Sequence, residues 1–91
     1  MKLEWDERKR RSNLAKHGID FADLEPLFAG LTITINDERF EYPEPRLLTV
    51  GFLSERLLVV AHTEMDRVIR IISARKATSH EKKIYLSQLR H

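Results

Sequence analysis

The 91-residue chain contains no cysteine, which excludes a disulfide framework and a zinc site built from thiolates. Glycine is also scarce, with three residues, and no Walker loop or Gly-x-Gly-x-x-Gly motif occurs, so we expect no nucleotide cofactor. The His-Glu-x-x-His motif and the serine nucleophile elbow are missing as well. The four histidines lack metal-ligand spacing, and we predict no bound metal. They are His17, His62, His80 and His91.

Long apolar runs are absent too. None approaches the roughly 20 residues that span a bilayer, and the charged N-terminus does not read as a signal peptide. We therefore expect a cytoplasmic protein without membrane contact. The length predicts a single domain over residues 1–91, and a composition of 42% hydrophobic and 33% charged residues is typical of a globular protein.

Charge is distributed unevenly along the chain. Residues 1–20 carry six Lys or Arg and four Asp or Glu, residues 21–45 carry one Arg and six acids, and residues 46–91 carry nine bases and four acids. An acidic middle between two basic ends predicts two faces with different partners, and a basic face favours a polyanion such as RNA or DNA. The alternative is a mixed, solvated surface.

Capping signals predict where the first helices begin and end. Asp6 can cap a helix over residues 7–17, and Gly18 suits the left-handed position that ends one. A second helical stretch is predicted over 21–29, because apolar residues recur there at helical spacing. Pro26 lies beyond the first turn of that stretch, so we expect a kink or a break.

Strands follow in the second half. We predict strands over 31–35, 47–53, 56–64 and 68–74, with turns at 54–55 and 65–67, and a final helix that begins at Thr78 or Ser79 with a capping box to Glu81. A short extended segment at 3–5 precedes the first helix. This order predicts an α+β fold, a small antiparallel sheet with helices mainly on one face and the other face open.

The candidates for chemistry are one histidine and two arginines in the apolar strands. His62 and Arg70 lie within apolar runs, and Arg75 ends the second run. A charge there needs a partner or a phosphate. The alternatives are a core histidine, an Arg70 salt bridge to Glu64 or another acid, and a solvated Arg75. Strict alternation places the two arginines on opposite faces of the sheet, unless the strand ends or bulges between them.

The first helix supplies further candidates. Its basic run, Arg8-Lys9-Arg10-Arg11, can bind RNA phosphates or can be a solvated helix face. Lys16 and His17 can bind RNA, or they can simply be placed in the last turn because positive charge is favourable at the negative end of the helix dipole. RNA cleavage without a metal needs only a base, an acid and fixed positive charge, which His, Lys and Arg can supply. We expect Trp5 to pack in the core. The candidate RNA-binding residues are Lys16, Arg8 and Arg11, and the candidate catalytic residues are His62, Arg70, Arg75 and His17.

These motifs together resemble the BrnT family of toxins. The resemblance lies in Glu4-Trp5-Asp6, in Lys16-His17-Gly18-Ile19-x-Phe21, in the segment from Leu57 to Glu64 and in the segment from Arg70 to Thr78, with Glu81 and Tyr85 in the final helix. It covers nearly the whole chain in the same order. Two features depart from the pattern, which are Pro26 and the acidic, proline-containing loop 36–46.

The resemblance implies a RelE-like fold and a ribonuclease that inhibits translation. It also implies a BrnA-type antitoxin with a ribbon-helix-helix DNA-binding domain, a complex of two toxins with two antitoxins, and repression of their operon through the antitoxin. The functional surface is then expected around Lys16, His17, His62, Arg70 and Arg75, and the acidic loop suits basic residues of the antitoxin. A non-catalytic module that binds nucleic acid or protein is the alternative function.

Overall fold

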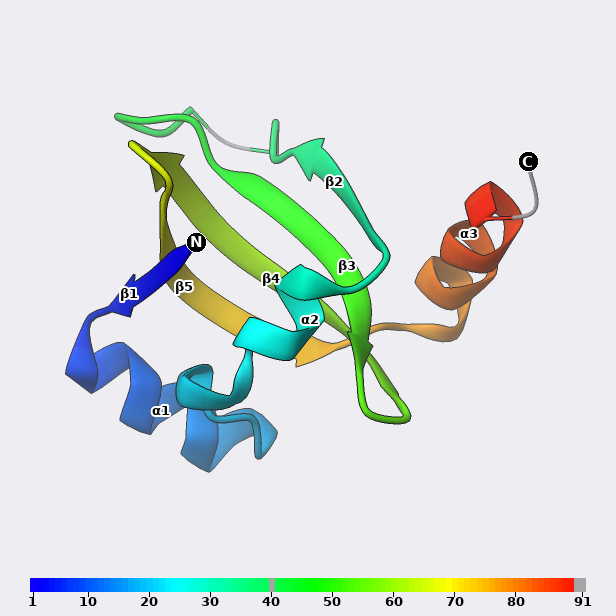
Figure 1. Ribbon diagram of the computed structural model, residues 1–91, viewed down its shortest axis with the longest axis horizontal. Helices are drawn as coiled ribbons and strands as arrows, with labels where there is room; N and C mark the ends of the chain where they lie inside the picture. Colours follow the sequence, from blue (N-terminus) through cyan, green and yellow to red (C-terminus); the bar gives the residue numbers. More distant parts are fainter. Residues whose placement is uncertain (40, 90–91) are drawn as a thin grey trace.

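The computed structural model describes residues 1–39 and 41–89 and contains one five-stranded sheet (Figure 1). The elements in chain order are β1 (Lys2–Trp5), α1 (Glu7–His17), the 3-10 helix η1 (Phe21–Asp23), α2 (Glu25–Ala29), β2 (Thr32–Asn36), β3 (Leu47–Leu53), β4 (Arg56–Met65), β5 (Val68–Lys76) and α3 (Ser79–Leu89). The order of strands in the sheet is β1-β5-β4-β3-β2. Within these described ranges, no helix has the length and apolarity needed to cross a membrane.

The predicted α+β class is confirmed, with one difference in the sheet. Strands β2 to β5 pair antiparallel as a meander, whereas β1 pairs parallel to β5 with Leu3 opposite Ile69. The sheet is therefore mixed. β1 precedes the helices, yet its neighbour in the sheet is β5, the last strand of the chain. A parallel pair joins segments that are far apart in the sequence, and the periodicity of each segment does not indicate its partner. The open sheet is compatible with the RelE-like fold implied by the resemblance.

Helix α1 has both predicted caps. The Asp6 carboxylate accepts the backbone N–H of Arg8 and of Lys9, and Gly18 ends the helix with φ 69°. Beyond Trp5 the edge of β5 is no longer covered by β1, and α1 lies against it there. Buried Asn13 makes this contact, because its Oδ1 accepts the N–H of Ala74 and its Nδ2 donates to the carbonyl of Ile19, at 3.0 and 3.1 Å.

The expected break in the second helical stretch is confirmed. Residues 21–29 form η1 and then α2, and Pro26 lies in the first turn of α2, where its missing N–H costs nothing. These two short helices contribute most of the core opposite the sheet. The fully buried side chains shared by the two sides include Phe21, Leu24, Leu27, Leu58, Val60 and Ile71.

A bulge in β5 decides the faces of the sheet. Ala61 pairs with Ser73 but His62 pairs with Ile71, so Ile72 is an extra residue. Arg70 lies opposite Thr63, and Arg75 lies opposite Val59. Because Thr63 and Val59 are four residues apart in β4, both arginines lie on the same face, the one opposite to the core. The bulge therefore breaks the strict alternation that would have placed Arg70 and Arg75 on opposite faces.

Helix α3 lies against part of that second face. The predicted capping box is present: the Glu81 N–H donates to Thr78 Oγ1, and the Thr78 N–H donates to Glu81 Oε1. Tyr85 is 3% exposed and donates its hydroxyl to the carbonyl of Leu31. Ile84 and Leu89 are each more than two-fifths exposed, because this helix touches the sheet along a narrow line.

Candidate RNA-binding groove and predicted catalytic residues

A basic groove of about 400 Å³ lies between α1 and β5. Arg8, Ser12 and Lys16 recur every four residues along the helix and therefore share one face of it. Ile72 and Ser73, next to the bulge, form the opposite wall. The remaining lining residues are Lys9, Asn13 and His17.

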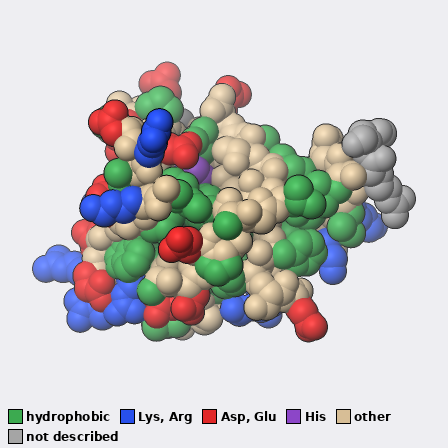
Figure 2. Space-filling view, viewed as in Figure 1, with side chains coloured by type: hydrophobic (Ala, Val, Ile, Leu, Met, Phe, Trp, Pro, Cys, Tyr) green, Lys and Arg blue, Asp and Glu red, His purple; other side chains and the backbone are tan. Residues whose placement is uncertain are grey.

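Among the described residues, the basic side chains of this groove form no hydrogen bond or ion pair with the protein. In residues 1–39 and 41–89, no side-chain hydrogen bond or ion pair involves Arg8, Lys9, Lys16 or His17, and no Asp or Glu lines the groove. Figure 2 shows Lys and Arg side chains gathered over the region of α1. Unpaired cations around a hollow attract a polyanion, and Lys and Arg side chains are the usual contacts to phosphate.

The rest of the basic run on α1 points elsewhere. Arg10 Nε donates to Glu7 Oε1 at 2.7 Å, and its guanidinium also donates to the Asp20 carboxylate at 3.1 Å. It therefore joins α1 to the start of η1. Arg11 is exposed and does not belong to the groove lining. Half of the run thus faces the groove.

His62 lies beneath the helices, on the core face of β4. The imidazole is 2% exposed, its Nε2 is hydrogen-bonded to Thr49 Oγ1 at 2.6 Å, and Phe28 of α2 packs edge-on at 5.2 Å between ring centroids. Burial lowers the pKa of His62, although the Thr63 backbone and the charge of Glu64 oppose that shift, so the neutral ring is favoured. This is the setting of a core histidine, the alternative left open by the sequence.

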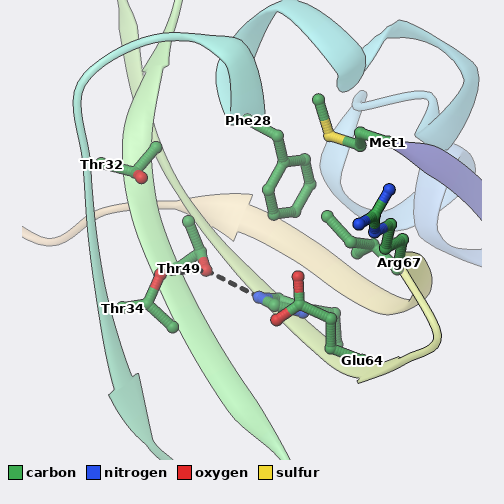
Figure 3. A pocket seen from close by; sticks show the side chains of 9 residues that line it. Met1, Phe28, Thr32, Thr34, Thr49, Glu64 and Arg67 are labelled. Carbon is green, nitrogen blue, oxygen red and sulfur yellow. Dashed lines mark hydrogen bonds between the residues drawn. The ribbon is translucent and has the colours of Figure 1, made fainter.

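A shallow pocket of about 370 Å³ lies over His62 (Figure 3). Its rim carries Thr34, Glu64 and Arg67, which are exposed, and its floor is formed by Phe28, Thr49 and the histidine. Thr49 Oγ1 also bonds Thr34 Oγ1 at 2.8 Å, so a chain of hydrogen bonds runs from the buried ring to the rim. The pocket gathers polar groups but shares no residue with the α1–β5 groove.

The two predicted arginines are both paired with carboxylates. Arg70 contacts Glu4 Oε1 at 3.4 Å with both side chains about half exposed, so Glu4 rather than Glu64 is its partner. Arg75 forms a two-pronged pair with Glu81 at 2.7 and 2.9 Å, which lowers the pKa of Glu81 to about 2 and raises that of Arg75. This second pair joins β5 to α3.

The structure therefore brings together some predicted site residues and separates others. Arg8, Lys16 and His17 lie in one groove. His62 lies on the core face, and Arg70 and Arg75 lie on the other face, so the four predicted catalytic residues do not form one cluster. Sequence reasoning missed Ser12 and Ser73 as groove residues. The spacing of positions 8, 12 and 16 was the available signal for Ser12, whereas Ser73 depends on the bulge.

In the part of the chain that the structure describes, no group of three His, Asp or Glu side chains is arranged to hold a metal ion. Two comparisons with known proteins add to this geometry. The family model described as the ribonuclease toxin BrnT of a type II toxin–antitoxin system matches residues 5–81. None of the curated proteins matches the chain.

Proposed function

Because the chain belongs to the BrnT family of ribonuclease toxins of type II toxin–antitoxin systems, we propose that it is an endoribonuclease whose RNA backbone lies in the α1–β5 groove. The unpaired cluster of Arg8, Lys16 and His17 around that groove is the observation that carries the proposal. Cleavage proceeds without a metal, and loss of RNA inhibits translation.

The reaction needs a proton acceptor, a proton donor and positive charge. The ribose 2′-oxygen attacks the adjacent phosphorus, the new O2′–P bond forms and the P–O5′ bond breaks. His17 accepts the proton of the 2′-hydroxyl, and Lys16 supplies a proton to the departing 5′-oxygen. Arg8 stabilises the negative charge that builds on the phosphate. The products are a 2′,3′-cyclic phosphate and a 5′-hydroxyl.

Catalytic roles for His62, Arg70 and Arg75 stay predictions. Arg70 is the most available of the three, because its pair with Glu4 is long and half exposed. A role for Arg75 requires that its pair with Glu81 opens, and a role for His62 requires that α2 moves away from the ring. An RNA contact by Arg11 is likewise open to test, from the outer side of α1.

The test is cleavage of single-stranded RNA by the purified chain in excess chelator, with analysis of the new ends. The wild-type chain should produce cyclic-phosphate and 5′-hydroxyl ends. His17→Ala should lower kcat at least about a hundredfold, the usual contribution of general acid–base catalysis. His80→Ala is the matched control, because His80 is exposed on α3 outside the groove, and it should cleave at the wild-type rate.

Two results would contradict this proposal. Equal rates for the two histidine variants would remove His17 from the chemistry. Salt-sensitive RNA binding without any product would indicate the alternative, a non-catalytic binding module.

The partner in this proposal is a BrnA-type antitoxin. Membership of a type II system supports a protein antitoxin. We propose further that this antitoxin is a ribbon-helix-helix protein. It neutralises the toxin in a complex of two copies of each chain and brings that complex to operator DNA. Co-expression with the protein of the neighbouring reading frame should abolish toxicity, and the mass of the purified complex should equal two copies of each chain.

A further inference from the structure

The outer edge of β2 is unprotected, unlike the other edge of the sheet. In the described sheet β2 pairs with β3 and has no neighbour on its other side. The opposite edge carries Lys2 and Glu4 on β1, and α1 covers β5 where β1 ends. Residues 31–36 read Leu-Thr-Ile-Thr-Ile-Asn and contain no charge and no proline. Natural sheets usually carry charged side chains or proline on their free edges, which prevents pairing with another strand. An edge without them indicates a strand-binding surface.

An apolar groove continues inward from this edge. It has a volume of about 230 Å³ and lies between α3 and the second face of the sheet. Ile35 and Leu31 beside it are 56% and 74% exposed. The groove is lined by Ile33, Ile35, Leu48, Val50, Val59, Ile84, Tyr85 and Glu81. Side chains of an added strand that point to this face would enter it.

Acidic side chains lie at the end of β2. The hollow that follows Asn36 is lined by four acids, which are Asp37, Glu38, Glu41 and Glu44, and by Asn36, Tyr42, Pro45 and Arg46. Arg46 is the one base among them, and its guanidinium stacks on the Tyr42 ring. Asp37 is paired with Arg39 at 2.9 Å. Across the described residues, no ion pair involves the other three carboxylates. Figure 2 shows Asp and Glu side chains along the rim where this loop lies. A partner here is favoured by basic residues.

We propose that an extended segment of the antitoxin adds a strand to β2, places alternate apolar side chains in the groove, and carries Lys or Arg residues that meet Glu38, Glu41 and Glu44. This rests on the proposed function for the existence of the antitoxin. The surface lies at the opposite edge of the sheet from the α1–β5 groove. The antitoxin is therefore anchored away from the RNA phosphates, and the anchor can be removed without touching them.

The experiment measures binding of the purified protein from the neighbouring reading frame by calorimetry. Ile35→Lys should weaken binding by about tenfold or more, because a lysine there must be buried against an apolar segment. Met65→Lys is the matched control, since Met65 is a 69% exposed apolar residue that lines neither the apolar groove nor the acidic hollow, and it should bind as the wild type does. Hydrogen exchange at Thr32–Asn36 should slow in the complex.

Each other outcome overturns the proposal. Wild-type affinity in Ile35→Lys, or unchanged exchange in β2, would exclude this docking surface. An isolated chain that is already a dimer with protected β2 amides would assign the edge to a second copy. RNA cleavage is measured in parallel: Ile35→Lys should still cleave and escape inhibition. A wild-type chain that never cleaves RNA would refute the proposed function and leave the binding result to judge the surface.

Discussion

At the scale of single residues, Asn13 shows how one polar side chain positions the candidate groove. It is 7% exposed, and it joins α1 to the end of the following loop and to the bare edge of β5. Its neighbours Ser12 and Lys16 then face the groove. A buried amide that satisfies two backbone groups contributes more than its own hydrogen bonds, because its loss leaves both groups unpaired.

Asn13→Ala is therefore expected to lower the free energy of unfolding by about 2 kcal/mol. Urea denaturation of the purified chain measures this. Arg11→Ala, on the exposed side of the same helix, should change it by less than about 0.5 kcal/mol. Equal midpoints for the two variants would show that Asn13 does not hold α1 in place.

The residue scale also shows what the sequence can predict. Asp6, Gly18 and the Thr78–Glu81 box were identified correctly, because caps depend on near neighbours in the chain. The partner of Asn13 lies 61 residues away, and the partner of Arg70 lies 66 residues away, so neither could be recognised from local pattern. The same limit applies to the predicted catalytic residues, because whether they lie together depends on contacts between distant parts of the chain.

At the scale of elements, α3 is attached to the sheet by few contacts. Among the described residues, its polar and aromatic contacts with the strands and with the residue before β2 are the Arg75–Glu81 pair, the Tyr85 hydroxyl on Leu31 and the Tyr85 ring against Phe52. The strands are different, because each is held by a ladder of hydrogen bonds to a neighbouring strand, and their predicted bounds were correct to within two residues. The helix start was predicted from its capping box, whereas its narrow contact with the sheet depends on side chains from β3 and β5.

The ion pair makes the attachment of α3 sensitive to acid. The pKa of Glu81 falls from an ordinary 4.5 to about 2 in the folded chain, mainly through its hydrogen bonds to Arg75. A lowered carboxyl pKa contributes stability that is fully present above pH 4.5 and is lost as the pH falls towards about 2. Glu81→Gln should therefore be less stable at pH 7 and lose less stability over that acid range.

Thermal unfolding followed by circular dichroism at a series of pH values measures this difference. Glu55→Gln, in the exposed β3–β4 turn, is the control and should follow the wild-type curve. Curves for wild type and Glu81→Gln that stay parallel between pH 4.5 and pH 2 would show that the pair does not contribute.

At the scale of the whole molecule, the uneven charge of the sequence becomes two separate surfaces. The basic groove lies at the β1–β5 edge, and the acidic hollow follows β2 at the other edge. The sequence predicted two faces with different partners, but the strand order decides that they are opposite edges of one sheet. The bulge at Ile72 adds a second long-range effect, since it turns Arg70 and Arg75 to one face and puts Ser73 in the groove.

The central claim is that RNA phosphates occupy the α1–β5 groove, and the salt dependence of RNA affinity tests it most directly. Measurements in a His17→Ala background keep the RNA intact. Replacing Arg8 and Lys16 by alanine removes two phosphate contacts, so the slope of log affinity against log salt should become shallower by about 1.4. Replacing Lys82 and Lys83, which are exposed on α3, should leave the slope unchanged. An unchanged slope in the groove variant, or an equal loss in the α3 variant, would contradict the account.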